Sequence, residues 1–165
     1  MPGQARLPVK IIDSDYFIVG SGIAGLLSAL HLSKHGRVFL ATKKERADSN
    51  TNRAQGGIAC VMTSEDSFED HVRDTLEAGA GLCDEAVVRR IVSAGPARIG
   101  ELEEMGLQFA EWSEGGKTGY DLGREGGHSR RRVLHAGDIT GQRVEQVLLE
   151  RVQAAGNVSI RERCL

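Results

Sequence analysis

The stretch "SDYFIVGSGIAGLLSALHLSKHGRVFLAT" (Ser14–Thr42) decides the fold of this chain. Its first seven residues are rich in aromatic and β-branched side chains and end at a glycine, which is typical of a buried strand. The segment that follows spaces apolar residues along one helical face and ends at Gly36. Residues 37–42 then return as a second strand. The order strand, helix, strand predicts a parallel βαβ unit within an α/β fold.

The turn between the first strand and the helix carries glycines in the spacing GxGxxG, at Gly20, Gly22 and Gly25. The first glycine permits a tight turn, the second lets the backbone approach a pyrophosphate, and the third lets helix and strand pack closely. Ordinary glycine-rich packing is the alternative, but a strand before and a helix after favour dinucleotide binding. The predicted cofactor contacts here are Gly20, Ser21, Gly22, Ile23, Ala24 and Gly25.

One element of the simple dinucleotide pattern is missing. An acidic residue usually follows about 20 residues after the glycines and binds the ribose, but Thr42 stands at this place, followed by Lys43 and Lys44. A threonine hydroxyl can bond to ribose, and we expect Lys43 to lie near a phosphate. Lys44 is expected in a solvated loop.

Composition limits the class of protein. The chain has 165 residues, of which 40% are hydrophobic, and its 21 basic and 23 acidic residues give a net charge of -2. These values predict one soluble domain over residues 1–165 with no overall attraction for nucleic acid. Three cysteines without CxxC spacing predict reduced thiols and no metal site. With no signal-like or membrane-spanning apolar run, we expect a cytoplasmic protein.

A second motif is "ADSNTNRAQGGIACV" (residues 47–61), which taken alone reads as a glycine turn. It resembles a Ser-x-Thr-x-x-Ala-Gln-Gly-Gly run of the succinate dehydrogenase and fumarate reductase flavoprotein superfamily, which wraps FAD. The resemblance implies an α/β, Rossmann-like FAD-binding domain. The implied contacts with FAD are Asn50, Thr51, Asn52, Arg53, Ala54, Gln55, Gly56 and Gly57.

Asn50 bears on how the flavin is held. In the branches of this superfamily with covalent flavin, a histidine five residues before the glutamine attaches the ring, and this place holds Asn50. An amide cannot form that bond. The resemblance therefore implies non-covalent FAD.

The rest of the chain is expected to be mostly scaffold. Helices are predicted from the Ser67 cap to the glycines near residue 80, from about 84 to 93, from Pro96 to Met105, and over residues 141–156. Two extended pieces flank a turn at residues 115–116, and residues 157–164 predict a further strand of the same sheet. His71 is expected on a polar helix face, and Trp112 and Tyr120 as packing residues.

The run "LGREGGHSRRRVLHAGD" (residues 122–138) concentrates arginines and histidines around two glycines. Phosphate contacts with nucleic acid are one interpretation, but no basic stripe extends the run. It resembles the signature of the L-aspartate oxidases, in which Glu125 takes a place that is typically apolar in dicarboxylate dehydrogenases. The resemblance implies that Glu125 pairs with the substrate α-ammonium and acts as the catalytic-site residue, leaving the two carboxylates to arginines and histidines.

The neighbours of Glu125 stay open. His128 and Ser129 could contact flavin or substrate, or form structural hydrogen bonds. Three consecutive arginines, residues 130–132, cannot all face one pocket, so some of them must lie at the surface or in ion pairs. His135 and Asp138 are interpreted as a supporting network, because no nucleophile completes a hydrolase site.

By this resemblance the implied reaction is oxidation of L-aspartate to iminoaspartate, with O2 (giving hydrogen peroxide) or fumarate as electron acceptor. This is the first step of NAD synthesis, and quinolinate synthase is the implied next enzyme. Family members carry a capping domain and a helical C-terminal domain beyond the matching region, so we expect an incomplete sheet and an inactive fragment. A fumarate reductase-like flavoprotein and a non-catalytic FAD-binding fragment are the alternatives.

Overall fold

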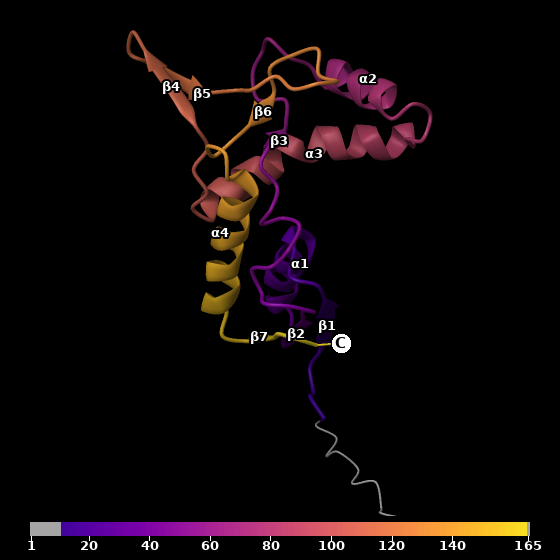
Figure 1. The fold of residues 1–165 in the computed structure, drawn as a ribbon, viewed down its shortest axis with the longest axis vertical. Coiled ribbons are helices and arrows are strands. Elements are labelled where there is room, and N and C mark those ends of the chain that lie inside the picture. The colour runs from indigo at the N-terminus through magenta and orange to yellow at the C-terminus, as the bar shows by residue number, and fades with distance from the viewer. Residues whose placement is uncertain (1–10, 165) are drawn as a thin grey trace, which may run out of the picture.

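The computed structural model describes residues 11–164 of the chain, and Figure 1 shows the arrangement of its elements. In chain order they are β1 (Tyr16–Val19), α1 (Ile23–Ser33), β2 (Val38–Ala41), β3 (Ile58–Ala59), α2 (Phe68–Ala78), α3 (Glu85–Glu104), β4 (Glu111–Glu114), β5 (Lys117–Tyr120), β6 (Val133–Leu134), α4 (Thr140–Ala154) and β7 (Val158–Arg161).

A parallel sheet of order β1-β2-β7 lies at one end of the molecule (Figure 1). The strand, helix and strand predicted around the glycine turn are β1, α1 and β2, and β7 joins the same sheet as predicted. The sheet packs α1 and α4 against one face, where Leu26, Leu40 and Leu148 are fully buried. The opposite face carries Phe17, which is 65% exposed and stacks on Phe39.

The helix α3 corrects a prediction, since one helix spans the region where two were expected. Pro96 lies inside α3 although proline lacks the N–H that an interior helical position normally donates. The buried residues Val88, Val92, Ile99 and Leu102 follow one helical face on both sides of Pro96. Continuous burial along this face holds the helix together across the proline.

Two small antiparallel pairs connect distant segments. The hairpin β4-β5 turns at residues 115–116, as predicted. The pair β3-β6 joins Ile58 to Leu134 and Ala59 to Val133. It thereby brings the end of the motif at residues 47–61 beside the end of the run at residues 122–138 (Figure 1).

Over residues 11–164, no helix is long and apolar enough to cross a membrane.

Candidate functional site

The glycine turn is built by close backbone approach. Gly20 has a φ of +104°, a conformation that favours glycine. A Cβ on Gly25 would lie 2.0 Å from the Gly20 carbonyl oxygen, so only glycine lets α1 approach the end of β1 so closely. The two glycines therefore have the turn and packing roles that the motif predicts.

The first N–H of α1 is capped from a distant loop. Gly22 offers no side chain at the N-cap, and the backbone N–H of Ile23 donates instead to Thr51 Oγ1 at 3.1 Å. Gly22 also lies near this hydroxyl, since a Cβ there would be 3.4 Å from Thr51 Oγ1. Thr51 thus joins the glycine turn to the motif at residues 47–61.

The two motifs line one cavity of about 610 Å³, here called the turn cavity. Its lining residues come from the end of β1, the end of β2 and the loop after it: Val19, Gly20, Ser21, Gly22, Thr42, Lys43, Lys44, Asp48, Ser49, Asn50, Thr51 and Arg53. Glycine backbone at a helix N-terminus, hydroxyls and cations make this lining suitable for a pyrophosphate. The residues present therefore fit the phosphate part of a dinucleotide.

The charges of the turn cavity are partly paired already. Asp48 accepts from Lys44 at 2.8 Å and from Arg53 at 2.6 Å. The hydrogen bond from Lys44 lowers the pKa of Asp48, although desolvation opposes this. Lys43 is exposed and forms no ion pair with residues 11–164, which leaves its ammonium available for a phosphate.

Thr42 lines the turn cavity and also has a hydrogen-bond partner within the protein. Its side chain is buried, and its Oγ1 lies 3.0 Å from the Ser21 hydroxyl. This contact joins the end of β2 to the glycine turn.

Helix α4 holds the loop of residues 49–57, a contribution that was not predicted from the sequence. The Gly141 N–H donates to the Ala54 carbonyl at 2.9 Å, and a Cβ on Gly141 would lie 1.9 Å from the Thr51 carbonyl oxygen. Glu145 is fully buried and accepts a hydrogen bond from Ser49 Oγ. The sequence offered one signal for this contact, because the Glu145 carboxylate stands among the apolar residues of an amphipathic helix.

Glu125 lies against the other end of this loop. A Cβ on Gly56 would be 3.3 Å from Glu125 Oε1, so the carboxylate faces the Gly56 backbone. The two residues line a cavity of about 560 Å³, here called the Glu125 cavity. Its full lining is Gln55, Gly56, Gly123, Glu125, Val133, His135, Gly137 and Asp138.

Most of the predicted site residues therefore line one of the two cavities. Those in the turn cavity are Gly20, Ser21, Gly22, Lys43, Asn50, Thr51 and Arg53, and those in the Glu125 cavity are Gln55, Gly56 and Glu125. Neither cavity is lined by Ile23, Ala24, Gly25, Asn52, Ala54 or Gly57.

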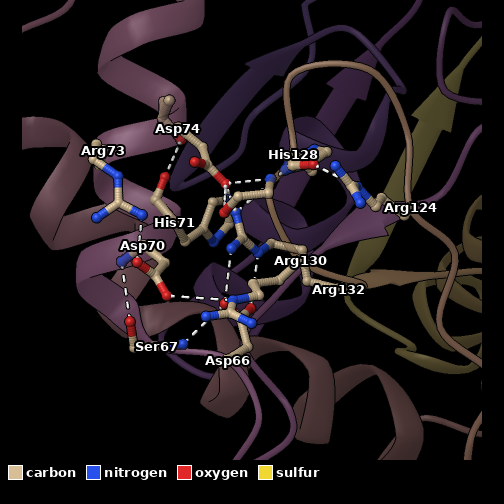
Figure 2. A network of polar contacts seen from close by, with 12 residues as sticks. Asp66, Ser67, Asp70, His71, Arg73, Asp74, Arg124, His128, Arg130 and Arg132 are labelled. Atoms are coloured by element: carbon tan, nitrogen blue, oxygen red, sulfur yellow. Dashed lines mark hydrogen bonds and ion pairs between the residues drawn. The ribbon is translucent and has the colours of Figure 1, made fainter.

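A buried arginine, Arg132, lies between Asp66 and Asp74 (Figure 2). The Arg132 side chain is 0% exposed, donates through Nε and Nη2 to the two oxygens of Asp66 at 2.8 and 2.7 Å, and donates through Nη1 to Asp74 at 2.7 Å. Burial would raise the pKa of Asp74, but hydrogen bonds from Ser129 and Arg132 outweigh it and lower the pKa to about 2. Ser129 thus forms the structural hydrogen bond that was one of its two alternatives.

The other two arginines of the triplet point elsewhere. Arg130 Nε lies 3.5 Å from Asp70, and Arg131 Nη1 donates to the Leu122 carbonyl at 3.2 Å. The prediction that the triplet cannot share one pocket is confirmed. No arginine lines the Glu125 cavity within the described residues, although His135 does.

His71 corrects a second prediction. It is buried, not on a polar face, because the segment carrying Arg132 covers this side of α2. Its ring packs edge-on against His128 at 5.8 Å between centroids. Burial, with help from Arg132 and His128, lowers the pKa of His71.

Comparison with known proteins agrees with this geometry. A family model described as FAD binding domain matches residues 15–165. This chain belongs to that family. The cofactor of the family is FAD, as predicted from the two motifs.

Curated relatives confirm the resemblance to L-aspartate oxidases over most of the chain. L-Aspartate oxidase 2-a of Nicotiana tabacum is 49% identical over 146 residues, covering 88% of this chain and 22% of the relative. L-Aspartate oxidase 1 of Ralstonia nicotianae is 47% identical over 148 residues, covering 90% of this chain and 28% of the relative. The chain spans about a quarter of the length of these relatives.

Among solved structures, this FAD binding domain is similar to the quinol fumarate reductase of E. coli. The TM-score is 0.82 with 29% identity, over 91% of this chain and 26% of the other. A 3-ketosteroid dehydrogenase of Rhodococcus jostii shares the fold at 15% identity, with a TM-score of 0.69.

Proposed function

We propose that this chain is the FAD-binding part of a flavoenzyme that oxidises L-aspartate to iminoaspartate. The electron acceptor is O2, which gives hydrogen peroxide, or fumarate. The reaction is the first step of NAD synthesis, and quinolinate synthase consumes the product. The observation that carries the proposal is the Glu125 carboxylate against Gly56, at the end of the loop expected to hold the flavin.

FAD would be held by the two cavities in sequence. The pyrophosphate would lie in the turn cavity, over the backbone of Gly20, Ser21 and Gly22 and near Lys43. The flavin end would follow the loop through Thr51 and Gln55 toward Gly56. Bound FAD supplies the two-electron acceptor for the reaction. Asn50 has no group that could attach the ring, so we propose that the FAD is non-covalent.

Glu125 would select the amino acid over the plain dicarboxylate. L-Aspartate differs from succinate by its α-ammonium group, and a carboxylate that meets this group forms a charge-assisted hydrogen bond. Against succinate, the same carboxylate would meet only apolar hydrogens or another carboxylate. Glu125 thereby favours L-aspartate and orients its Cα toward the end of the loop at Gly56.

Two alternatives have support of their own. The similarity to E. coli quinol fumarate reductase favours a dicarboxylate enzyme, but Glu125 opposes it. A non-catalytic FAD-binding module is favoured by the Glu125 cavity, whose lining includes two carboxylates and no arginine for the substrate carboxylates. This lining also implies weak binding of L-aspartate by the chain itself.

A ligand titration tests the proposal. We expect L-aspartate to shift the amide resonances of Gly56 and Gly126 in the FAD-loaded protein at concentrations about tenfold below those needed for succinate, since a charge-assisted hydrogen bond contributes about 1.5–3 kcal/mol. Glu125→Gln should remove this preference, whereas Glu114→Gln, on the exposed hairpin, should keep it.

Peroxide formation is measured on the same samples. We expect little hydrogen peroxide with L-aspartate, because no arginine of the Glu125 cavity holds the substrate carboxylates. Equal shifts with both ligands would contradict the proposed substrate, and rapid peroxide production would contradict the incomplete pocket.

A further inference from the structure

We propose that Arg132 and Asp74 are positioning residues for Glu125, and that their buried ion pair fixes the turn of residues 125–128 against α2. The inference rests on the proposed role of Glu125 in binding the substrate ammonium.

The turn itself is exposed and has little to hold it. Glu125, Gly126 and Gly127 are all exposed. The turn is closed by the His128 N–H, which donates to the Glu125 carbonyl at 3.2 Å, and by Arg124 Nε, which donates to the His128 carbonyl at 2.9 Å. Exposed turns of this kind open readily unless their ends are fixed by buried groups.

Asp74 fixes the end of the turn. Its Oδ2 accepts from the Ser129 N–H, the Ser129 hydroxyl and Arg132 Nη1, each at 2.7 Å. Ser129 directly follows the turn, and Asp74 belongs to the buried face of α2. A single carboxylate oxygen therefore joins the helix both to the residue that follows the turn and to Arg132 (Figure 2).

Arg132 makes this fixation rigid. Its guanidinium is fully buried between Asp66 and Asp74, with His128 Nδ1 3.4 Å from Nη1. Removing one member of such a buried set leaves an uncompensated charge, so the set holds together as a unit. Arg132 directly precedes Val133, which pairs with Ala59 in β3-β6 and lies beside Gly57. This pairing holds the segment that carries Glu125 next to Gly56.

Arg130 provides a matched control. It carries the same charge two residues away, but its side chain is 55% exposed and reaches only Asp70 at 3.5 Å. A conservative change there removes no buried contact.

The test uses amide hydrogen exchange, followed by NMR, in the FAD-loaded protein. We expect the His128 and Ser129 amides to exchange at least about tenfold faster in Arg132→Lys, which corresponds to about 1.4 kcal/mol of local opening free energy. Ser129→Ala, which removes one hydroxyl contact and leaves the buried pair intact, should accelerate them about three- to fivefold. Arg130→Lys should change them less than about twofold.

A second readout separates positioning from general stability. Arg132→Lys should lose affinity for L-aspartate about tenfold, and Ser129→Ala about three- to fivefold. The affinity of both variants for succinate, which has no ammonium, should stay within about twofold. Amides of α1 and α4 report whether each variant is folded, and Ser129→Ala decides the matter if Arg132→Lys does not fold.

The outcomes distinguish the two proposals. Unchanged exchange at His128 and Ser129 in every folded variant would overturn the positioning role, as would equal loss of both ligands. A wild-type protein that does not prefer L-aspartate would instead overturn the proposed substrate, and the exchange rates would still decide whether the network fixes the turn.

Discussion

At the scale of single residues, Gly25 is the position of the glycine turn where an added side chain should destabilise the fold most. A methyl group there would lie 2.0 Å from a backbone oxygen that no rotamer change can move. We expect Gly25→Ala to lower the free energy of unfolding by about 3 kcal/mol or more, at the upper end of the range for overpacking. Urea denaturation followed by circular dichroism measures the effect.

Gly100 is the control for this substitution, because it is also a helical glycine but has open space where a Cβ would stand. Gly100→Ala should be neutral or stabilise the protein by up to about 1 kcal/mol, since alanine favours helix. Similar losses in both variants would show that helical glycines in general, rather than the contact with Gly20, explain the effect.

The residues of the site were predictable to different degrees. Gly20 and Gly25 follow from the motif, because turn and packing constraints act between residues close in sequence. Gly141 and Glu145 contact the loop of residues 49–57 from nearly a hundred residues away, and only the fold places them there. The contact between the hydroxyls of Thr42 and Ser21 likewise follows from the fold and not from the spacing of the motif.

At the scale of elements, the attachment of α2 to the segment after the Glu125 turn should depend on pH. The pKa of Asp74 is lowered to about 2 in the folded protein, against an ordinary value of 3.8. A lowered carboxyl pKa contributes stability that is present above about pH 4 and lost as the pH falls through about 2. The contribution is on the order of 2 kcal/mol.

Urea unfolding between pH 2 and pH 6 measures this contribution. Asp74→Asn should be less stable than the wild type at pH 6, and the difference should shrink as the pH falls toward 2. Asp84→Asn keeps the N-cap of α3 and serves as the control, because an asparagine caps about as well as an aspartate. A difference between wild type and Asp74→Asn that is constant with pH would rule out this linkage.

Elements were predicted well where local signals agree with burial. The N-cap of α2 is confirmed, since Ser67 Oγ accepts the Asp70 N–H as the capping pattern predicts. The prediction failed at Pro96, where packing of one face outweighs a local helix breaker, and at His71, where a distant segment covers the helix. Both failures come from contacts between segments far apart in sequence.

At the scale of the whole molecule, the turn cavity is assembled from three separate segments, at residues 19–22, 42–44 and 48–53. A ligand that binds only this assembled state stabilises the fold by mass action. We expect FAD at one hundred times its dissociation constant to raise the free energy of unfolding by about 2.7 kcal/mol.

Because Asn50 cannot attach the ring, acid precipitation should release all of the flavin into the supernatant. Flavin retained in the acid precipitate would contradict non-covalent binding.

Thr51→Val tests whether the contact between the segments carries this coupling. It keeps the side-chain shape but removes the oxygen that accepts the Ile23 N–H, so FAD should bind about tenfold more weakly and stabilise the fold correspondingly less at a fixed concentration. Thr118→Val, on the exposed strand β5, should leave the FAD effect unchanged. An equal FAD effect in Thr51→Val and wild type would show that the cap of α1 does not contribute to holding the cofactor.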